Sequence, residues 1–92
     1  MKSEWDQSKA AVNLKKHGVS FEEAKTVFDN PLAVIFDDEV NSIDERREII
    51  VGHSQQNRLL LIAFTERSSN IRITSARLAT RKEREDYEQN AL

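Results

Sequence analysis

The chain has 92 residues, a formal net charge of −2 and a charged fraction of 33%. It has no cysteine and only two glycines, which excludes disulfides, thiolate metal sites and glycine-rich phosphate-binding loops. A chain of this length forms one domain, so we expect residues 1–92 to fold as a single unit. No apolar run approaches the roughly 18 residues of a membrane span, so we expect no membrane association and a cytoplasmic location.

The first expected element is a helix that begins after Asp6. An aspartate accepts hydrogen bonds from the free amides of a first helical turn, and a partial apolar stripe follows Asp6 up to about residue 16. Gly18 is well placed to end this helix, because glycine readily adopts the left-handed conformation that follows a last turn.

A second helix is expected to begin at Ser20. Ser20 and Glu23 fit a capping box, in which the hydroxyl accepts from the Glu23 amide and the carboxylate returns to the Ser20 amide. Apolar residues recur at helical spacing over residues 21–28, and the Asn30-Pro31 pair stops the helix.

The rest of the chain predicts a sheet followed by a helix. Branched side chains are concentrated in four runs with polar connections, at residues 32–36, 48–53, 58–65 and 71–76. A further capping box, Thr80 with Glu83, predicts a last helix that ends near residue 89. The expected fold class is therefore α+β, with two N-terminal helices, an antiparallel sheet of three to four strands and a C-terminal helix.

The hairpin lengths predict a register for this sheet. They place Arg77 opposite Leu60, and both Ile73 and Arg47 opposite Phe64. Alternation along the strands then predicts one helix-covered face, which consists of Ile49, Val51, Leu60, Ile62, Phe64 and Ile73.

Charge is distributed unevenly along the chain. Residues 29–48 contain seven acidic and two basic residues, whereas residues 58–84 contain seven basic and two acidic residues. Such asymmetry can build a local positive field in a protein of negative net charge. The alternative is that the two blocks neutralise each other on a solvated surface, and charge alone leaves both open.

Arginine-rich surfaces suit the chemistry of RNA cleavage. A guanidinium is always charged and can bind a phosphate through two parallel hydrogen bonds. The ribose 2′-hydroxyl is itself the nucleophile, so fixed cations and groups that move protons are sufficient catalysts. His17, Lys16 and Glu45 are the candidates for proton transfer. His17 could instead cap a helix end, and Glu45 could simply neutralise a neighbouring arginine.

Metal chemistry has little support in the sequence. His17 and His53 are far apart and lack ligand spacing with other residues, so we expect no metal site and no cofactor.

Four segments of the chain resemble one known family. They are EWDQSKAAVNLKKHGVSFEEAKTVFDNPLAVIFDD, ERREIIVGHS, RLLLIAFTER and IRITSARLATRKERE, which together span about residues 4–85. They resemble the BrnT toxins, including the ordered W-D-x-x-K-A-x-x-N-x-x-K-H-G-V-x-F block from Trp5 to Phe21. The resemblance implies a RelE-like ribonuclease that cleaves RNA without metal and arrests translation. It also implies a ribbon-helix-helix antitoxin that covers the active surface in a hetero-oligomer, and contact with operator DNA only through that antitoxin.

The resemblance also implies roles for individual residues. The family's arginines and its K-H-G segment fall on this chain at positions that give a catalytic set of Arg67, Arg77, Arg47, His17 and Glu45. Glu45 is included because Arg46 stands where many family members have a glutamate. The remaining expected RNA contacts are Lys16, Arg58, Arg72 and Arg81.

Two other functions fit the same residues. The chain could be a catalytically silent module that binds an antitoxin and acts as a co-repressor, or it could bind RNA without turnover. The second is disfavoured because one tryptophan, one tyrosine and four phenylalanines are too few and too scattered for a base-stacking surface.

Overall fold

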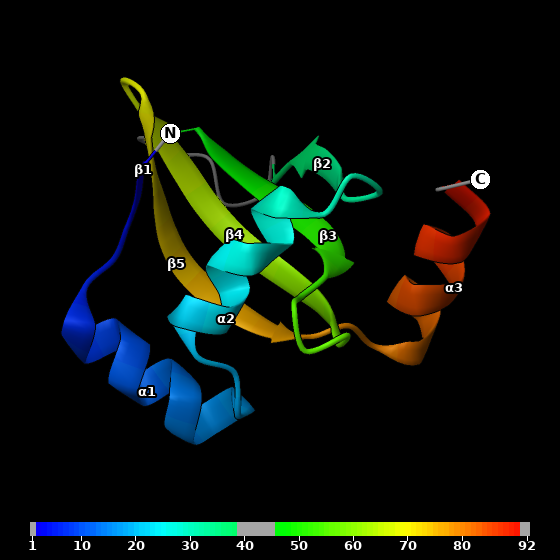
Figure 1. Ribbon diagram of the computed structural model, residues 1–92, viewed down its shortest axis with the longest axis horizontal. Coiled ribbons are helices and arrows are strands. Elements are labelled where there is room, and N and C mark those ends of the chain that lie inside the picture. Colours follow the sequence, from blue (N-terminus) through cyan, green and yellow to red (C-terminus); the bar gives the residue numbers. More distant parts are fainter. Residues whose placement is uncertain (1, 39–45, 91–92) are drawn as a thin grey trace.

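The computed structural model describes residues 2–38 and 46–90, which form three α-helices, one 3₁₀ helix and a five-stranded sheet. The strand order in the sheet is β1-β5-β4-β3-β2. Figure 1 shows α2 in front of the sheet, α1 beside β5, and α3 standing apart at the far end. The elements are β1 (Lys2–Glu4), α1 (Gln7–His17), α2 (Phe21–Lys25), η1 (Thr26–Asp29), β2 (Val34–Asp37), β3 (Arg47–His53), β4 (Leu59–Arg67), β5 (Asn70–Leu78) and α3 (Arg81–Asn90).

The α+β class and the three helical regions are confirmed, but the expected sheet was too small. It has five strands rather than three to four, and it is mixed rather than antiparallel, because β1 pairs with β5 in parallel through Lys2–Asn70 and Glu4–Arg72. Nothing in residues 2–4 predicts β1, since three polar residues show no apolar alternation. Arg72 also pairs with Glu4 at 3.3 Å, which ties β1 to its neighbour by a side-chain contact.

The expected helix ends are largely confirmed. Asp6 Oδ1 accepts hydrogen bonds from the amides of Ser8 and Lys9 at 2.7 and 3.1 Å, and Gly18 ends α1 with a φ of 69°. Ser20 Oγ accepts from the Glu23 amide at 3.0 Å. The other half of that capping box is wrong, because the Glu23 carboxylate turns away from the helix start and accepts hydrogen bonds from Ser54 and Arg58, which lie in the turn before β4.

The main core lies on the face of the sheet covered by α2 and η1, which we call the front face. Fully buried aliphatic and aromatic side chains fill it: Val19, Phe21, Val27, Leu60, Ile62 and Ile73. Burying one such side chain contributes roughly 1.5–3 kcal/mol, so this cluster supplies most of the favourable free energy of folding. The opposite, back face carries a smaller apolar cluster around Val51, Leu59 and Tyr87.

A bulge in β5 changes which face carries Arg77. The predicted pairing of Ile73 with Phe64 is confirmed, but the register shifts between Ala63 and Phe64, so Arg77 lies opposite Leu61 rather than Leu60. A slip of one residue moves every later side chain to the other face of the sheet. Arg77 therefore lies on the back face, in one cross-strand row with Leu61.

The predicted register of β3 was wrong by one residue for a similar reason. The turn closes with the Ser54 amide bonded to the Arg58 carbonyl, so β3 and β4 pair from His53–Leu59 onward and Arg47 lies opposite Thr65. Ile49 and Val51 consequently belong to the back face, and Ile50 takes the core position that had been assigned to them.

Asn13 joins α1 to the edge of β5. Its side-chain amide donates to the carbonyls of Ala76 and Val19 at 2.7 and 3.0 Å, and its Oδ1 accepts from the Ala76 amide at 3.1 Å. One buried side chain thus pairs with both backbone groups of Ala76, as a neighbouring strand would, at a point beyond the end of β1.

Candidate active site

A row of three side chains, two of them arginines, crosses three strands on the back face. Arg47 on β3 lies opposite Thr65 on β4, and Thr65 lies opposite Arg72 on β5. Directly paired residues project from the same side of a sheet, and neighbouring strands are about 4.8 Å apart, so the two arginines flank the threonine at about 10 Å from each other. The Thr65 hydroxyl is buried and finds no hydrogen-bond partner among the described residues.

A cavity of about 350 Å³ adjoins this row between α1 and the bulge of β5. Its polar lining includes the two helix residues that the sequence singled out, Lys16 and His17, together with Lys9. Across the cavity lie Thr74 and Ser75 of the bulge. The cavity therefore brings cationic and imidazole groups of α1 to the exposed edge of the sheet.

Arg47 connects the row to the cavity. Its guanidinium donates to Thr74 Oγ1 at 3.1 Å, and the same hydroxyl donates to the Ala63 carbonyl at 3.1 Å. The hydroxyl is in reach of Arg47 because the register shift at Ala63 leaves Thr74 outside the regular pairing. Local backbone irregularity thus positions Arg47 beside the wall of the cavity that faces Lys16 and His17.

Arg67 lies further along the same strand. It is exposed near the tip of the β4–β5 hairpin, two residues beyond Thr65, which is about 7 Å along a strand. Alternation places Arg67 on the same side of β4 as Thr65. The structure therefore brings Arg47 and Arg72 to one end of the back face, with Arg67 at its margin. Lys16 and His17 line the cavity that reaches Thr74, and they lie toward the end of α1 where Gly18 contacts Arg58.

Arg77 lies at the other end of the back face. Its partner Leu61 is four residues from Thr65, or about 13 Å along β4. Its guanidinium forms a two-pronged ion pair with Glu83 of α3, at 2.7 and 2.8 Å. The hydrogen bonds from Arg77 lower the pKa of Glu83 to about 2, and the same contact raises the pKa of Arg77. One phosphate bound at the Arg47 row would not reach Arg77 in this arrangement.

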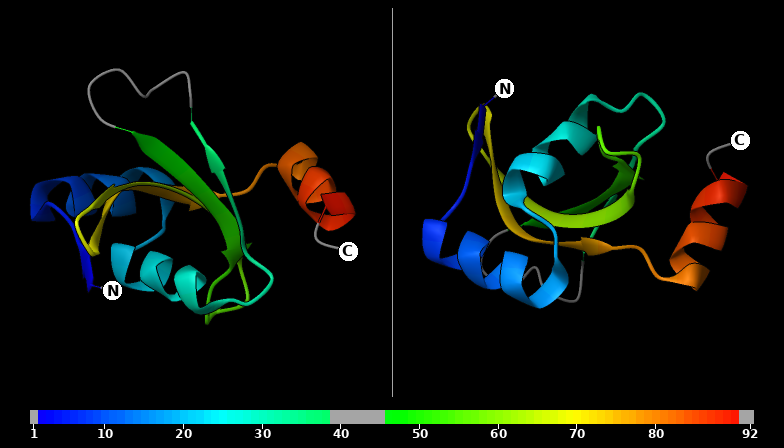
Figure 2. Two further views of the ribbon diagram at one scale, coloured as in Figure 1. Left: turned by 90° about the horizontal axis from the view of Figure 1, so that it is seen from above. Right: turned by 60° about the horizontal axis from the view of Figure 1, so that its bottom comes forward.

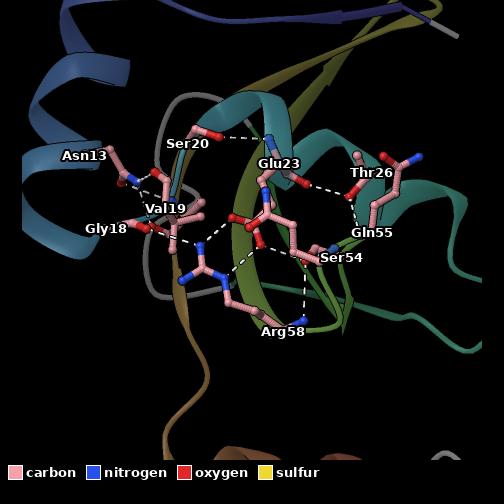
Figure 3. Close-up of polar contacts among 11 residues, drawn as sticks. Asn13, Gly18, Val19, Ser20, Glu23, Thr26, Ser54, Gln55 and Arg58 are labelled. Atoms are coloured by element: carbon pink, nitrogen blue, oxygen red, sulfur yellow. Dashed lines mark hydrogen bonds and ion pairs between the residues drawn. The ribbon is translucent and has the colours of Figure 1, made fainter.

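Arg58 is part of the scaffold that joins β4 to α2 (Figure 3). Its Nε donates to Glu23 Oε2 at 2.9 Å, its terminal nitrogen bonds Glu23 Oε1, and that nitrogen also donates to the Gly18 carbonyl at 3.2 Å. Ser54 Oγ donates to the same carboxylate at 2.7 Å. The hydrogen bonds from Arg58, and to a smaller extent the one from Ser54, lower the pKa of Glu23. The Glu23 carboxylate in turn raises the pKa of Arg58.

The remaining predicted residues lie elsewhere. Arg81 is on the exposed surface of α3, where it pairs with Glu85 at 3.4 Å. Glu45 lies outside the described residues. Within residues 2–38 and 46–90, no group of three His, Asp or Glu side chains is placed to hold a metal ion.

Comparison with known proteins assigns the chain to a family. The family model described as "Ribonuclease toxin, BrnT, of type II toxin-antitoxin system" matches residues 5–83. The chain belongs to the BrnT family. Its fold is also similar to the 1.1 Å crystal structure of the Brucella abortus ribonuclease toxin BrnT, with a TM-score of 0.68 and 23% sequence identity over 88% of this chain and 99% of that one. No curated protein matches the chain.

Membership of the BrnT family implies an antitoxin partner and an RNA target. Across the part of the chain that is described, no helix is long and apolar enough to span a membrane.

Sequence reasoning missed several residues of this candidate site. Lys9 was not singled out, although Lys9, Asn13 and Lys16 are spaced i, i+4 and i+7, a pattern that places them on one helical face. Thr65 and Thr74 carried no sequence signal, because their positions depend on the sheet register and on the bulge.

Proposed function

We propose that this chain is a metal-independent endoribonuclease toxin that cleaves RNA at the cavity between α1 and the β5 bulge. The observation that carries the proposal is the hydrogen bond from Arg47 to Thr74, which places a guanidinium beside the cavity lined by Lys16 and His17. Family membership supplies the class of reaction, and this geometry supplies the groups that the reaction needs.

Arg47 and Arg72 would bind the scissile phosphate. Their row presents two cations about 10 Å apart across three strands, which suits a phosphodiester between them. Negative charge grows on the nonbridging oxygens as the phosphorus becomes pentacoordinate, and fixed cations aimed at those oxygens lower the barrier. Arg72 would leave Glu4 to bind the phosphate. Its ion pair with Glu4 is partly exposed and, at 3.3 Å, longer than a strong charge-assisted hydrogen bond.

His17 and Lys16 would move the protons. His17 accepts the proton of the ribose 2′-hydroxyl as that oxygen attacks the phosphorus. The bond from phosphorus to the 5′-oxygen then breaks, and Lys16 returns a proton to the leaving oxygen. The products are a 2′,3′-cyclic phosphate and a 5′-hydroxyl. Glu45 stays a prediction as an alternative base.

The other arginines have different proposed roles. Arg67 would bind a neighbouring phosphate at the hairpin tip. Arg77 would join the site only after it leaves Glu83. Its partner on β4, Leu61, lies about 13 Å along that strand from Thr65, the partner of Arg47. We leave Arg58 and Arg81 out of the proposed RNA contacts, since Arg58 is engaged with Glu23 and Arg81 projects from α3.

The proposed cellular role is translation arrest in the cytoplasm, relieved by a ribbon-helix-helix antitoxin in a hetero-oligomer that reaches operator DNA only through the antitoxin. A RelE-like fold stays a prediction as well. The alternative of a silent co-repressor module would keep the complex and lose the nuclease.

The test is cleavage of an RNA by the purified toxin, freed from its antitoxin, in excess EDTA. We expect cleavage by the natural protein and a loss of roughly 10²–10⁴-fold for His17→Ala or Arg47→Ala. Lys25→Ala on α2 and Arg84→Ala on α3 are exposed controls of the same charge, and both should cleave normally. Intact RNA with the natural protein, or full activity of both site variants, would contradict the proposal.

A further inference from the structure

The strand β2 ends the sheet with apolar side chains half exposed on both of its faces. Among residues 2–38 and 46–90 it pairs only with β3, and it is the last strand in the order of the sheet (Figure 1). Ile35, which points to the front face, is 52% exposed, and Phe36, which points to the back face, is 48% exposed. Nearby Leu32 is also largely exposed.

An apolar groove of about 380 Å³ continues from β2 across the back face toward α3. Its floor is formed by Val34, Phe36, Ile49, Val51 and Leu61, and Tyr87 of α3 forms one wall. Figure 2 shows α3 well separated from the other helices. Tyr87 joins α3 to the segment before β2, because its hydroxyl donates to the Leu32 carbonyl at 3.0 Å. The Tyr87 ring also contacts the ring of His53.

The exposure pattern favours an added strand over other occupants. A helix laid in the groove, or a nucleobase inserted there, would cover Phe36 and leave Ile35 in water. A strand paired with the free edge of β2 covers side chains on both faces at once, because successive residues of the strand alternate between them. β2 contains no proline, lysine or bulge, and its one charged side chain, Asp37, is at its last position, so Val34, Ile35 and Phe36 are an apolar edge.

The electrostatics of the groove select a cationic occupant and disfavour RNA. The charged residues of its rim are Arg77, Glu83 and Asp86. Arg77 is already paired with Glu83, whereas Asp86 has only a long, exposed pair with Lys82 at 3.9 Å. The last turn of α3 carries no basic residue to offset the partial negative charge of the helix C-terminus. A basic side chain on the occupant would supply that missing charge.

We infer that the free edge of β2 is the docking site of the antitoxin, which adds an extended segment as a sixth strand. This inference rests on the proposed neutralisation by an antitoxin. The segment would have alternating apolar residues, one set over Phe36 and the groove and the other over Ile35, with a basic residue near the end of α3. A strand in this place would hold α3 and the Arg77–Glu83 pair in position, 13 Å or so along β4 from the proposed phosphate row.

The test compares three toxin variants in complex with the antitoxin encoded beside the toxin. Ile35→Lys and Phe36→Ala should each weaken the complex about 30-fold or more in a titration. Leu14→Lys is the matched control, because Leu14 is 51% exposed on α1, and it should bind normally. Thermal melting of the free toxins checks that the variants fold.

Hydrogen exchange of the complex tests the backbone pairing directly. Amides within Val34–Asp37 should gain protection when the antitoxin binds, because a sixth strand takes up their free groups. Weakening by Phe36→Ala alone, without protection of β2, would indicate a helix in the groove and overturn the inference, as would normal binding by both variants. Loss of RNA cleavage in Phe36→Ala, with the complex unchanged, would assign the groove to RNA instead. Because cleavage by the freed toxin is measured separately, failure of this docking site is distinguishable from failure of the nuclease.

Discussion

Replacement of Arg58 by alanine should destabilise the fold without abolishing RNA cleavage. The Glu23 side chain is only 3% exposed, and Arg58 supplies it with hydrogen bonds from two nitrogens, while Ser54 supplies one more. Without Arg58, a buried carboxylate keeps one side-chain donor and loses its counter-charge.

The expected loss is about 2–3 kcal/mol of unfolding free energy. Breaking a fully buried ion pair costs roughly 3–5 kcal/mol, and the lower figure applies here because the Arg58 side chain is 34% exposed and water can replace part of it. At roughly 4–8 °C per kcal/mol for a domain of this size, the melting temperature should fall by about 10–20 °C.

The assay is thermal and urea unfolding of Arg58→Ala, Glu23→Gln and the double variant. The sum of the two single losses of unfolding free energy should exceed the loss in the double variant by about 1.5 kcal/mol or more. Arg81→Ala is the matched control: it breaks a pair that is 93% and 58% exposed, and it should cost about 0.5 kcal/mol or less. Arg58→Ala that melts like the natural protein but no longer cleaves RNA would refute this reasoning and return Arg58 to the RNA site.

Three further predictions concern other parts of the fold. Glu83→Gln should cost about 1–2 kcal/mol at neutral pH, after allowance for solvent screening of a partly exposed pair. Since the pKa of Glu83 is about 2 in the folded protein against an ordinary value of 4.5, that contribution is present above pH 4.5 and is lost as the pH falls toward 2, so urea curves of the variant and natural protein should converge in acid. Asn13→Ala should cost about 2–3 kcal/mol in the same assay, because it leaves buried backbone groups of Ala76 and Val19 without partners; an unchanged midpoint would show that water replaces the amide. Gly52→Ala should cost about 1–3 kcal/mol, because its new Cβ would lie 2.8 Å from the Ala33 Cβ, and a neutral result would mean that the segment before β2 moves aside readily.

Local signals in the sequence predicted the helices well. Asp6 and Gly18 bound α1 as expected, and both halves of the Thr80–Glu83 capping box form, with Thr80 N to Glu83 Oε1 at 2.8 Å and Glu83 N to Thr80 Oγ1 at 3.2 Å. These contacts depend on residues close in the chain, so their geometry follows from spacing. The same rule failed for the Glu23 carboxylate, because Arg58 and Ser54 approach from far along the chain and bind it more strongly.

The faces of the strands were less predictable, because they depend on pairing over long distances. One bulge residue in β5 and one residue of turn length before β4 moved Arg77, Ile49 and Val51 to the back face. The bulge in β5 has no glycine or proline to mark it, and Gly52, beside the β3–β4 turn, is explained by the close approach of Ala33 rather than by the shift.

The candidate site was predictable in residue type and only partly in arrangement. His17 and Lys16 were placed by their motif, and both line the cavity with Thr74. The partner of each arginine could not be predicted, since an arginine side chain that could bind phosphate can equally bind a carboxylate nearby. Three of the arginines bind carboxylates in the structure: Arg58 pairs with Glu23, Arg77 with Glu83 and Arg72 with Glu4.

The central claim is that the 2′-hydroxyl of RNA attacks its own phosphate in the cavity that contains His17. Analysis of the RNA ends formed by the freed toxin in EDTA tests this most directly, with a second substrate that carries a single 2′-deoxy nucleotide at the cleavage position. We predict 2′,3′-cyclic phosphate and 5′-hydroxyl ends, no cleavage at the deoxy position, and loss of both products in His17→Ala. Ends with a 5′-phosphate and a 3′-hydroxyl, or cleavage at the deoxy nucleotide, would contradict it.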